Sequence, residues 1–247
     1  MDKRLADKRV LVTGASRGLG RVICQRFAAH GARVAFTYTR DEAGAVATRA
    51  LIEAEGQEAA AYQVSVLDSE KTASMVRELD TRWGGLDVLV NNAGVTQNLP
   101  LALLEEDDWD KVMDVNVKGT FLTSKAVLRS MIRRKQGVIL NIGSLAGVRM
   151  IDAPIHYCAS KAAIVGLSNA MAKDVARHRI RVVCLAPGLL EDGVGRNLPE
   201  HRLADYLHHC SLGRVGSFDE VAEMAVFLAS DESSYITGAT LLMDGGV

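Results

Sequence analysis

Hydrophobic residues gather along this chain of 247 residues in short continuous runs, and longer amphipathic stretches separate the runs. Continuous apolar runs are typical of strands buried on both faces, whereas apolar residues at helical spacing predict helices. Glycines at positions 31 and 56 follow two of the amphipathic stretches and predict helix ends there. The expected strands cover residues 10–13, 33–38, 59–66, 86–91, 137–142, 180–185 and 239–243. The expected helices cover residues 18–30, 42–55, 69–83, 105–134 and 219–230, and a further helix carries Tyr157 and runs to about residue 178.

This alternation of strands and helices predicts one α/β domain. Parallel strands need crossover connections, and helices supply them while they cover both faces of the sheet. No linker, internal repeat or low-complexity segment divides the chain. We therefore expect a single domain over residues 1–247, built on a doubly wound parallel sheet of about seven strands with helices on both faces.

Composition and charge are those of an ordinary globular protein and exclude several classes of function. Hydrophobic residues make up 48% and charged residues 24% of the chain, and the formal net charge is −1. A balance so close to neutral argues against general binding to nucleic acid or to anionic membranes. The first residues are charged, and no apolar run reaches the ~18 residues of a membrane-spanning helix. The sequence therefore predicts a soluble, cytoplasmic protein.

The cysteine and histidine residues do not form a metal-binding pattern. Cys24, Cys158, Cys184 and Cys210 are widely separated, with no Cys-x-x-Cys pair and no zinc-ligand spacing. The adjacent histidines at 208–209 are too close in sequence to ligate from one helix face, so we expect them in solvent. We expect buried, reduced thiols and no bound metal.

A glycine-rich loop joins the first expected strand to the first expected helix. It reads Thr-Gly-Ala-Ser-Arg-Gly-Leu-Gly from Thr13 to Gly20. Glycines allow a sharp turn and let the backbone approach a pyrophosphate, whose charge is stabilised at the helix N-terminus. The spacing is Gly-x-x-x-Gly-x-Gly rather than the Gly-x-Gly-x-x-Gly of the common dinucleotide-binding fingerprint. Glycines also mark plain turns, but the strand–turn–helix context favours a phosphate-binding loop.

A second group of polar residues surrounds Tyr157. Tyr157 and Lys161 are four residues apart, so on a helix they stand on one face, one turn from each other. A nearby ammonium favours the phenolate and is expected to lower the tyrosine pKa from its usual value of ~10. Ser144, on another element, can hydrogen-bond a substrate oxygen beside the phenol. Such a trio can protonate an alkoxide as it forms, which carbonyl reduction requires. The alternative for an isolated Tyr-x-x-x-Lys is an ordinary surface helix.

Together these motifs resemble the short-chain dehydrogenase/reductase family, whose fold is Rossmann-like. The resemblance extends over the whole chain, and the motifs occur in the family's order. Within the family the chain looks most like the 3-oxoacyl-[acyl-carrier-protein] reductases. The motifs are the glycine loop, Asn91-Asn-Ala-Gly94, Asn116, Ser144, Tyr157, Lys161 and Pro187-Gly188. The resemblance to this subfamily depends on four sequence stretches. They are Val12-Thr-Gly-Ala-Ser-Arg-Gly, Leu89-Val-Asn-Asn-Ala-Gly-Val, Phe227-Leu-Ala-Ser-Asp-Glu-Ser-Ser-Tyr-Ile-Thr-Gly and Asp244-Gly-Gly.

The resemblance implies a role for each of these residues. Tyr157 would be the catalytic acid/base, Lys161 its pKa partner and a ligand of the cofactor ribose, and Ser144 would orient the substrate oxygen. Asn116 would kink the long helix and hold a water that links Lys161 to solvent. The segment from Asn91 to Gly94 would line the adenosine side of the site. The implied cofactor-binding residues are Gly14, Ser16, Arg17, Gly18, Leu19, Gly20, Tyr38, Arg40, Ser65, Val66, Asn92, Ala93, Gly94, Tyr157, Lys161, Pro187 and Gly188.

Some of these residues also have a plainer structural interpretation. Asparagine is common in turns, so Asn91 and Asn92 alternatively only end a strand. Pro187-Gly188 is first a strand-ending turn and only secondarily shapes the nicotinamide pocket. Asn116 is different, because asparagine in a helix interior costs about half a kcal/mol relative to alanine. That cost indicates a special role.

The residues at the end of the second strand decide between NAD and NADP. An NAD site needs a carboxylate there to accept from the ribose 2′-hydroxyl, and the family's acidic position falls on Tyr38. Arg17 in the glycine loop and Arg40 after the strand are placed to meet the 2′-phosphate of NADP, which suits the planar guanidinium. We predict NADP(H). The alternative is that Arg40 is a solvated charge and that Asp41 serves a 2′-hydroxyl.

Two positions depart from the family pattern. The third strand usually ends in Asp-Val against the adenine, whereas here the pair is Ser65-Val66, so Ser65 or the backbone must make that contact. The family usually has a threonine near the nicotinamide amide, and here Asp192 stands in that neighbourhood. The grip on the amide is therefore in question. Residues from about 189 to 216 are expected to form a substrate lid.

The resemblance also implies partners. Basic residues cluster before the fifth and sixth strands, and in carrier-protein reductases similar positions dock the acidic carrier from a neighbouring subunit. Alternatively, they are the cations favoured at helix C-termini. Small residues along the Tyr157 helix, taken with the resemblance, predict a homotetramer with 222 symmetry. The candidate docking residues are Arg133, Arg134, Lys135, Arg177 and Arg179.

The function expected from this resemblance is NADPH-dependent reduction of a 3-oxoacyl thioester, held on a carrier protein, in fatty-acid or polyketide-like synthesis. One alternative is a dehydrogenase of a small alcohol, sugar or steroid. A second is a non-catalytic regulator that binds a dinucleotide, which the complete set of four catalytic-type residues disfavours. A third is a methyltransferase that shares the glycine loop, and the tyrosine–lysine pair gives it no support.

Overall fold

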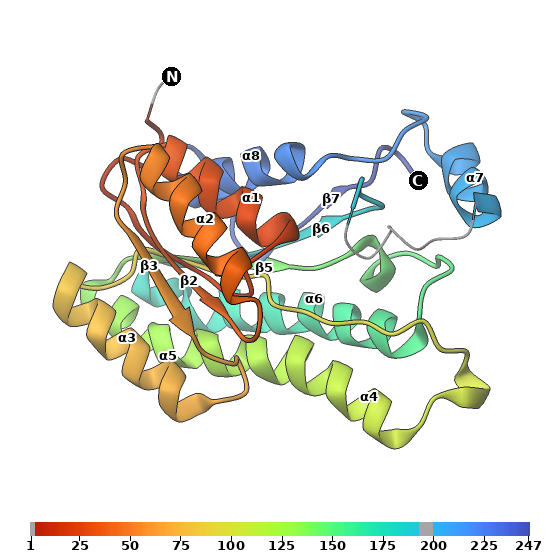
Figure 1. Ribbon diagram of the computed structural model, residues 1–247, viewed down its shortest axis with the longest axis horizontal. Coiled ribbons are helices and arrows are strands. Elements are labelled where there is room, and N and C mark those ends of the chain that lie inside the picture. Colours follow the sequence, from red (N-terminus) through yellow and green to blue (C-terminus); the bar gives the residue numbers. More distant parts are fainter. Residues whose placement is uncertain (1–2, 193–199) are drawn as a thin grey trace.

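The computed structural model describes residues 3–192 and 200–247. In these residues seven strands form one fully parallel sheet in the order β3-β2-β1-β4-β5-β6-β7, as predicted (Figure 1). The order reverses between β1 and β4, which opens a crevice at the carboxyl ends of these strands. The strands are β1 (Arg9–Val12), β2 (Arg33–Tyr38), β3 (Ala59–Gln63), β4 (Val88–Asn91), β5 (Gly137–Ile142), β6 (Ile180–Pro187) and β7 (Thr240–Met243).

Helices cover both faces of the sheet. In Figure 1, α1, α2 and α8 lie on one face, and α3, α5 and α6 lie on the other. The helix α4 continues from α5 beyond the sheet. The bounds are α1 (Gly18–Ala29), α2 (Glu42–Ala54), α3 (Ser69–Trp83), α4 (Glu106–Met113), α5 (Gly119–Arg134), α6 (Ile155–Val175), α7 (Glu200–His209) and α8 (Phe218–Ala229).

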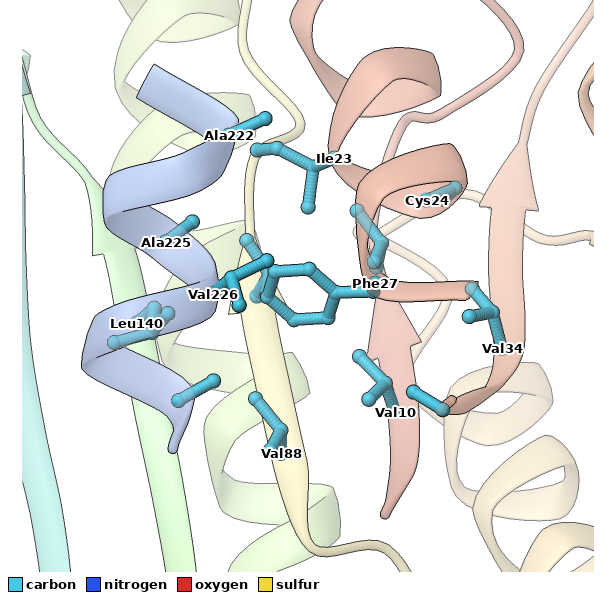
Figure 2. Close-up of a cluster of buried hydrophobic side chains, with 14 of the residues drawn as sticks. Val10, Ile23, Cys24, Phe27, Val34, Val88, Leu140, Ala222, Ala225 and Val226 are labelled. Atoms are coloured by element: carbon cyan, nitrogen blue, oxygen red, sulfur yellow. The ribbon is translucent and has the colours of Figure 1, made fainter. Parts of the chain in front are cut away.

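The sheet separates two hydrophobic cores because successive strand residues point to opposite faces. On β1, Val10 and Val12 belong to the core under α1 and α8, whereas Leu11 belongs to the core under α3, α5 and α6. Figure 2 shows Phe27 of α1 pointing toward Val226 of α8. All of these side chains are buried, and full burial of one such side chain stabilises the fold by about 1.5–3 kcal/mol.

The ends of several helices follow the local signals in the sequence. Gly31 and Gly56 have φ of +93° and +74°, and each follows the end of a helix at the predicted position. At the other end, Asp41 caps α2 by accepting a hydrogen bond from the Gly44 backbone N–H at 2.8 Å. Left-handed backbone favours glycine, and a capping carboxylate satisfies one of the free amides of the first turn.

Three elements differ from the predicted ones. The expected helix over 105–134 is interrupted by a π-helical segment, Asp114–Lys118, that joins α4 to α5 and contains Asn116, where the resemblance implied a kink. The third strand ends at Gln63, so Ser65 and Val66 lie in the loop that follows it. The helix α7 lies within the expected lid, where no helix was predicted, and residues 193–199 of that lid lie outside the described residues.

Candidate active site

The glycine loop follows β1 at the carboxyl edge of the sheet. Gly14 and Gly18 have φ of +65° and +57°, which L-residues rarely adopt. A Cβ on Gly14 would lie 2.9 Å from the Ala93 Cα atom, and one on Gly20 would lie 2.5 Å from Asn92 Nδ2. A Cβ on Gly18 would meet no atom within 4 Å, so the backbone there faces open space. Two glycines thus allow close packing and one leaves room, which fits the cradle expected for a dinucleotide phosphate.

The side chain of Asn92 braces this loop from the end of β4. Its Nδ2 donates to the carbonyl oxygens of Thr13 and Gly14, both at 3.0 Å. In return the Thr13 hydroxyl accepts from the backbone N–H groups of Asn92 and Ala93, also at 3.0 Å each. The two predicted cofactor segments are therefore joined directly. Thr13 was not predicted as a site residue, although its place at the start of the loop was a usable signal.

Asn91 has a different role from the expected one. Its side chain is buried and donates to Ser124 Oγ at 2.9 Å and to Asn141 Oδ1 at 2.8 Å. The expectation that Asn91 lines the adenosine side is wrong for this side chain, which points between β5 and α5. Buried polar side chains need such partners because an unsatisfied group costs about 1–3 kcal/mol. Ala93 and Gly94 remain at the strand end, where Gly94 lies beside Asn116.

The structure brings Ser144, Tyr157 and Lys161 together as predicted. Ser144 follows β5, and Tyr157 and Lys161 lie on the first two turns of α6. The Lys161 ammonium donates to the carbonyl of Ile142, the last residue of β5, at 2.7 Å. It also lies 5.6 Å from the centre of the Tyr157 ring. The Ser144 hydroxyl interacts with the Tyr157 phenol and accepts from the Ala146 backbone N–H at 3.2 Å.

The pKa values at this site are set mainly by burial. Burial raises the pKa of Tyr157, and the hydrogen bond with Ser144 acts in the opposite direction without cancelling it. Burial also lowers the pKa of Lys161 from 10.5 to about 8. The expected lowering of the Tyr157 pKa by Lys161 is therefore not found in the protein alone. The reason is that loss of solvation disfavours the charged form of both groups.

Asn116 lies at the centre of the π-helical segment and is almost fully buried. Its Oδ1 accepts from the Val95 backbone N–H at 2.8 Å, and its Nδ2 donates to the Val95 carbonyl at 3.0 Å. Nδ2 also donates to Ser160 Oγ at 2.9 Å. The special role indicated by the sequence is thus visible as a clamp between the loop after β4 and α6. The water that would link this region to Lys161 remains a prediction.

The end of β2 carries the residues expected to choose the cofactor. Tyr38 is half-buried there, while Arg17 and Arg40 are exposed. Asp41 is the N-cap of α2, so at least one of its carboxylate oxygens is already engaged. This geometry disfavours the alternative in which Asp41 serves a ribose 2′-hydroxyl.

The expected adenine contacts lie in the loop after β3. The Ser65 hydroxyl accepts from the Leu67 backbone N–H at 3.2 Å. Val66 is buried, and its side chain fills the place that a Cβ on Gly119 would need. Of the pair, therefore, Ser65 is the one with a polar group near the loop surface.

The Pro187-Gly188 turn ends β6 and meets α7. The Gly188 N–H donates to the Met243 carbonyl at 2.9 Å, and a Cβ on Gly188 would collide with the Tyr206 hydroxyl. That hydroxyl accepts from the Leu189 N–H at 2.9 Å and donates to the Asp244 carbonyl at 3.4 Å. Tyr206 thus joins the described part of the expected lid to the end of β7, beside the expected nicotinamide pocket. The sequence contained no motif that would have indicated it.

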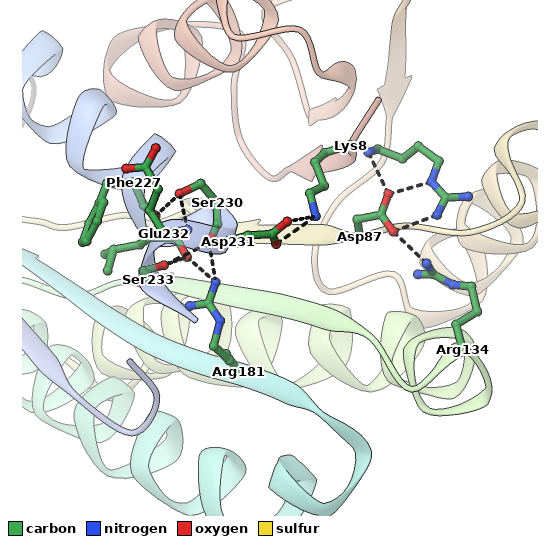
Figure 3. A network of polar contacts seen from close by, with 11 residues as sticks. Lys8, Asp87, Arg134, Arg181, Phe227, Ser230, Asp231, Glu232 and Ser233 are labelled. Atoms are coloured by element: carbon green, nitrogen blue, oxygen red, sulfur yellow. Dashed lines mark hydrogen bonds and ion pairs between the residues drawn. The ribbon is translucent and has the colours of Figure 1, made fainter. Parts of the chain in front are cut away.

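The basic residues proposed for carrier docking differ in their environments. Arg134 is largely buried and donates to Asp87 at 2.7 Å (Figure 3). It also donates to the Leu86 carbonyl. Arg133 is exposed and lies 3.5 Å from Asp80. All of them precede β5 or β6 and so lie at the edge of the sheet opposite Tyr157. The exposed members are Arg133, Lys135, Arg177 and Arg179.

The cysteines and the possible metal ligands were also the subject of predictions. Cys24, Cys184 and Cys210 are buried, whereas Cys158, beside Tyr157, is only half-buried. Within residues 3–192 and 200–247, no three histidine, cysteine or acidic side chains gather as a metal site would require. In the same residues no helix is both long and apolar enough to cross a bilayer.

Comparison with known proteins agrees with this geometry. The family model described as "Enoyl-(Acyl carrier protein) reductase" matches residues 14–247. The 3-oxoacyl-[acyl-carrier-protein] reductase of Chlamydia muridarum is 38% identical over 247 residues, which is 100% of both chains. The enzyme of the same name from Escherichia coli is 38% identical over 240 residues, or 97% of each chain. The chain belongs to the short-chain dehydrogenase/reductase family.

Solved structures of this family share the whole fold. A putative short-chain alcohol dehydrogenase from Sinorhizobium meliloti superposes with a TM-score of 0.93 at 38% identity, covering 100% of this chain and 98% of that one. NAD⁺-bound xylitol dehydrogenase superposes with a TM-score of 0.91 at 30% identity, covering 98% and 99%. The protein is thus an oxidoreductase of this family, and a nicotinamide dinucleotide is its class of cofactor.

Proposed function

We propose that the protein reduces a 3-oxoacyl thioester, carried on an acyl carrier protein, to the 3-hydroxyacyl form with NADPH. The observation that carries the reaction type is the contact of Ser144 with Tyr157, with Lys161 one helical turn away. The substrate class is supported by the full-length similarity to reductases whose names specify 3-oxoacyl-[acyl-carrier-protein].

In this proposal each residue of the chain has one task. A bound nicotinamide supplies the hydride that reduces the ketone carbon. Ser144 holds the ketone oxygen by a hydrogen bond, and Tyr157 donates its phenolic proton to that oxygen as negative charge develops there. The raised pKa of Tyr157 keeps the phenol protonated before the reaction. Lys161 then stabilises the phenolate that remains.

The choice of NADPH is supported by the residues after β2. Arg17 and Arg40 are exposed, and the strand ends in Tyr38 rather than in a carboxylate. A guanidinium can donate two parallel hydrogen bonds to a phosphate, which the 2′-hydroxyl of NAD does not offer. Asp41 is engaged as a helix cap. We therefore propose NADP(H) as the physiological cofactor.

A panel of substrates tests the proposal. The purified protein is mixed with 3-oxoacyl thioesters on carrier protein, on coenzyme A and on a short pantetheine mimic, each with NADPH or NADH, and loss of absorbance at the reduced nicotinamide band is followed. We expect turnover of thioester ketones with a clear preference for NADPH. Turnover of free ketones or alcohols alone would refute the substrate class, and a preference for NADH would refute the cofactor.

A second candidate is a dehydrogenase of a small molecule. Structural similarity favours it, because xylitol dehydrogenase and levodione reductase superpose with TM-scores of 0.91 and 0.92. Their identities of 30% and 29% are lower than the 38% shared with the carrier-protein reductases. The same panel distinguishes the two candidates when xylitol and levodione are included.

A further inference from the structure

The helix α6 contains two fully buried serines with similar hydrogen bonds. Ser160 Oγ donates to the carbonyl of Tyr157 at 2.8 Å and accepts from Asn116 Nδ2 at 2.9 Å. Ser168 Oγ donates to the carbonyl of Ile164 at 2.7 Å and accepts from Asn141 Nδ2 at 2.8 Å. In each case a buried amide reaches a helix carbonyl through a serine hydroxyl.

The two relays differ in what they connect. Ser168 lies about two turns further along α6, and its amide partner is Asn141 of β5. The Asn141 side chain also accepts from Asn91. The relay of Ser160 ends on the carbonyl of Tyr157, and its amide partner holds both backbone groups of Val95. Ser160 therefore links the residue with the reacting phenol to the loop that follows β4.

The start of α6 has no side-chain cap. Its N-cap is Pro154, which provides no side-chain hydrogen bond to the first turn. Tyr157 lies in that turn, where backbone amides have no partner within the helix. One turn later the Lys161 ammonium anchors the helix to the end of β5. The hydrogen bond from Asn116 to Ser160 is a further link, and it comes from the π-helical segment.

We propose that Ser160 is a positioning residue for carbonyl reduction. Its hydroxyl transmits the placement of Asn116 and Val95 to the backbone of Tyr157, and so fixes the phenol relative to Ser144 and Lys161. This inference rests on the proposed role of Tyr157 as proton donor. A small displacement is sufficient to matter, because a shift of ~1 Å in a reacting group can cost about 10²-fold in rate.

Ser160→Ala tests the proposal, with Ser168→Ala as the matched control. Both variants remove one buried hydroxyl from the same helix and leave one asparagine Nδ2 without that acceptor. For Ser160→Ala we expect kcat to fall about tenfold, with KM for NADPH within twofold of wild type. For Ser168→Ala we expect a lower melting temperature and a kcat within twofold of wild type. Ser160→Thr, which keeps the hydroxyl, should restore kcat.

A titration of the tyrosine separates this inference from the proposed function. Phenolate absorbance is measured against pH, and the Tyr157 contribution is the difference from Tyr157→Phe. We expect its midpoint to shift by at least half a pH unit in Ser160→Ala and to stay unchanged in Ser168→Ala. This measurement needs no substrate, so it remains decisive even when no thioester is reduced.

Two outcomes would overturn the proposal. One is wild-type kcat and an unchanged Tyr157 titration in Ser160→Ala. The other is an equal loss of kcat in both alanine variants, because the effect would then follow stability alone. If Ser160→Ala does not fold, the isosteric pair Ser160→Thr and Ser160→Val decides, since the two differ only by a hydroxyl for a methyl. Equal kcat and equal titrations in that pair would reject the role of the hydroxyl.

Discussion

Lys161 donates to the carbonyl of Ile142 at 2.7 Å and lies 5.6 Å from the centre of the Tyr157 ring. The end of β5 therefore fixes the ammonium while the helix fixes the phenol. In this arrangement burial keeps Tyr157 protonated and leaves Lys161 with a pKa of about 8. The pair is suited to give up a proton when charge develops on a neighbouring oxygen, rather than to hold a standing phenolate.

Tyr157→Phe should abolish reduction while it leaves the binding of NADPH within about threefold of wild type. Only the hydroxyl is lost, and a general acid is typically worth about 10²–10⁴-fold in rate. Steady-state kinetics and fluorescence titration with NADPH measure the two effects. A variant that retains more than a tenth of the wild-type kcat would exclude Tyr157 as the proton donor.

Lys161 should make the protein without cofactor more stable as the pH rises from about 8 toward 10.5. Its folded pKa is lowered to about 8, so in this range the folded protein has lost a proton that the unfolded chain still holds. Stability rises with pH wherever the unfolded state binds more protons. Below pH 8 both states are protonated, and the contribution of Lys161 is constant.

Lys161→Met isolates this contribution from those of other groups. The free energy of unfolding is measured in urea at pH 7.5 and pH 9.5 for wild type and variant. We expect the change between the two pH values to be more positive in wild type by about 1–2 kcal/mol, because each pH unit contributes at most ~1.4 kcal/mol. Identical pH dependence in the two proteins would show that Lys161 keeps its ordinary pKa.

Much of the fold was predictable because its signals are local. The strand β1 contains the continuous apolar run of residues 10–12 directly before the glycine loop, and Gly31 and Gly56 mark helix ends by their backbone requirements. A break in the long helix at Asn116 was expected from the family resemblance alone, because the local sequence does not show the tertiary contact between Asn116 and Val95 that accompanies the π-helical segment. The helix α7 was missed because it has only 10 residues and its apolar stripe, Leu203, Tyr206 and Leu207, is short and only half-buried.

The candidate site was predictable for those residues whose side-chain chemistry and spacing themselves indicate a function. Tyr157, Lys161 and Ser144 meet as expected, and so do the glycine loop and Asn92. The role of Asn91 was not predictable, because the sequence does not say which of two adjacent asparagines faces the core. The pKa direction of Tyr157 was wrong because helical spacing indicates the nearby ammonium but not the extent of burial.

Arg40→Ala should weaken NADPH far more than NADH. The loss of a charge-assisted contact to the 2′-phosphate costs about 1.5–3 kcal/mol, or at least tenfold in Kd. Arg33→Ala is the control, because Arg33 is also an exposed arginine of β2 but lies at the opposite end of the strand. Calorimetric titration of both variants with both cofactors measures the difference. Equal losses for NADPH and NADH would identify Arg40 as a solvated charge.

We expect the protein to be a homotetramer. Exposed Phe121 on α5 lies with Met113, Val117 and Leu167 around one surface hollow, and such an apolar face is typical of contacts between subunits. Light scattering at micromolar concentration should give about four times the chain mass of 26.6 kDa. Phe121→Glu should reduce the assembled mass to that of a dimer or monomer. A monomeric wild-type protein would contradict the prediction.

The tetramer matters for the carrier protein because the exposed basic residues lie at the edge of the sheet opposite Tyr157 within one chain. They can serve an active site only when a neighbouring subunit presents them. Lys135→Glu and Arg177→Glu should therefore raise KM for the carrier-bound substrate at least fivefold and leave KM for a short pantetheine thioester unchanged. The effect should weaken with added salt, since the contacts are between exposed charges.

Two other arginines complete this test of docking. Arg49→Glu on the exposed side of α2 makes the same charge change elsewhere and should leave both KM values unchanged. Arg134→Ala should instead lower the melting temperature, because it removes a largely buried partner of Asp87. If Lys135→Glu and Arg49→Glu raise KM for the carrier-bound substrate equally, the effect follows the net charge of the protein and not a docking site. An unchanged KM in Lys135→Glu and Arg177→Glu would contradict docking and favour the alternative, in which these cations stabilise the C-terminal ends of α5 and α6.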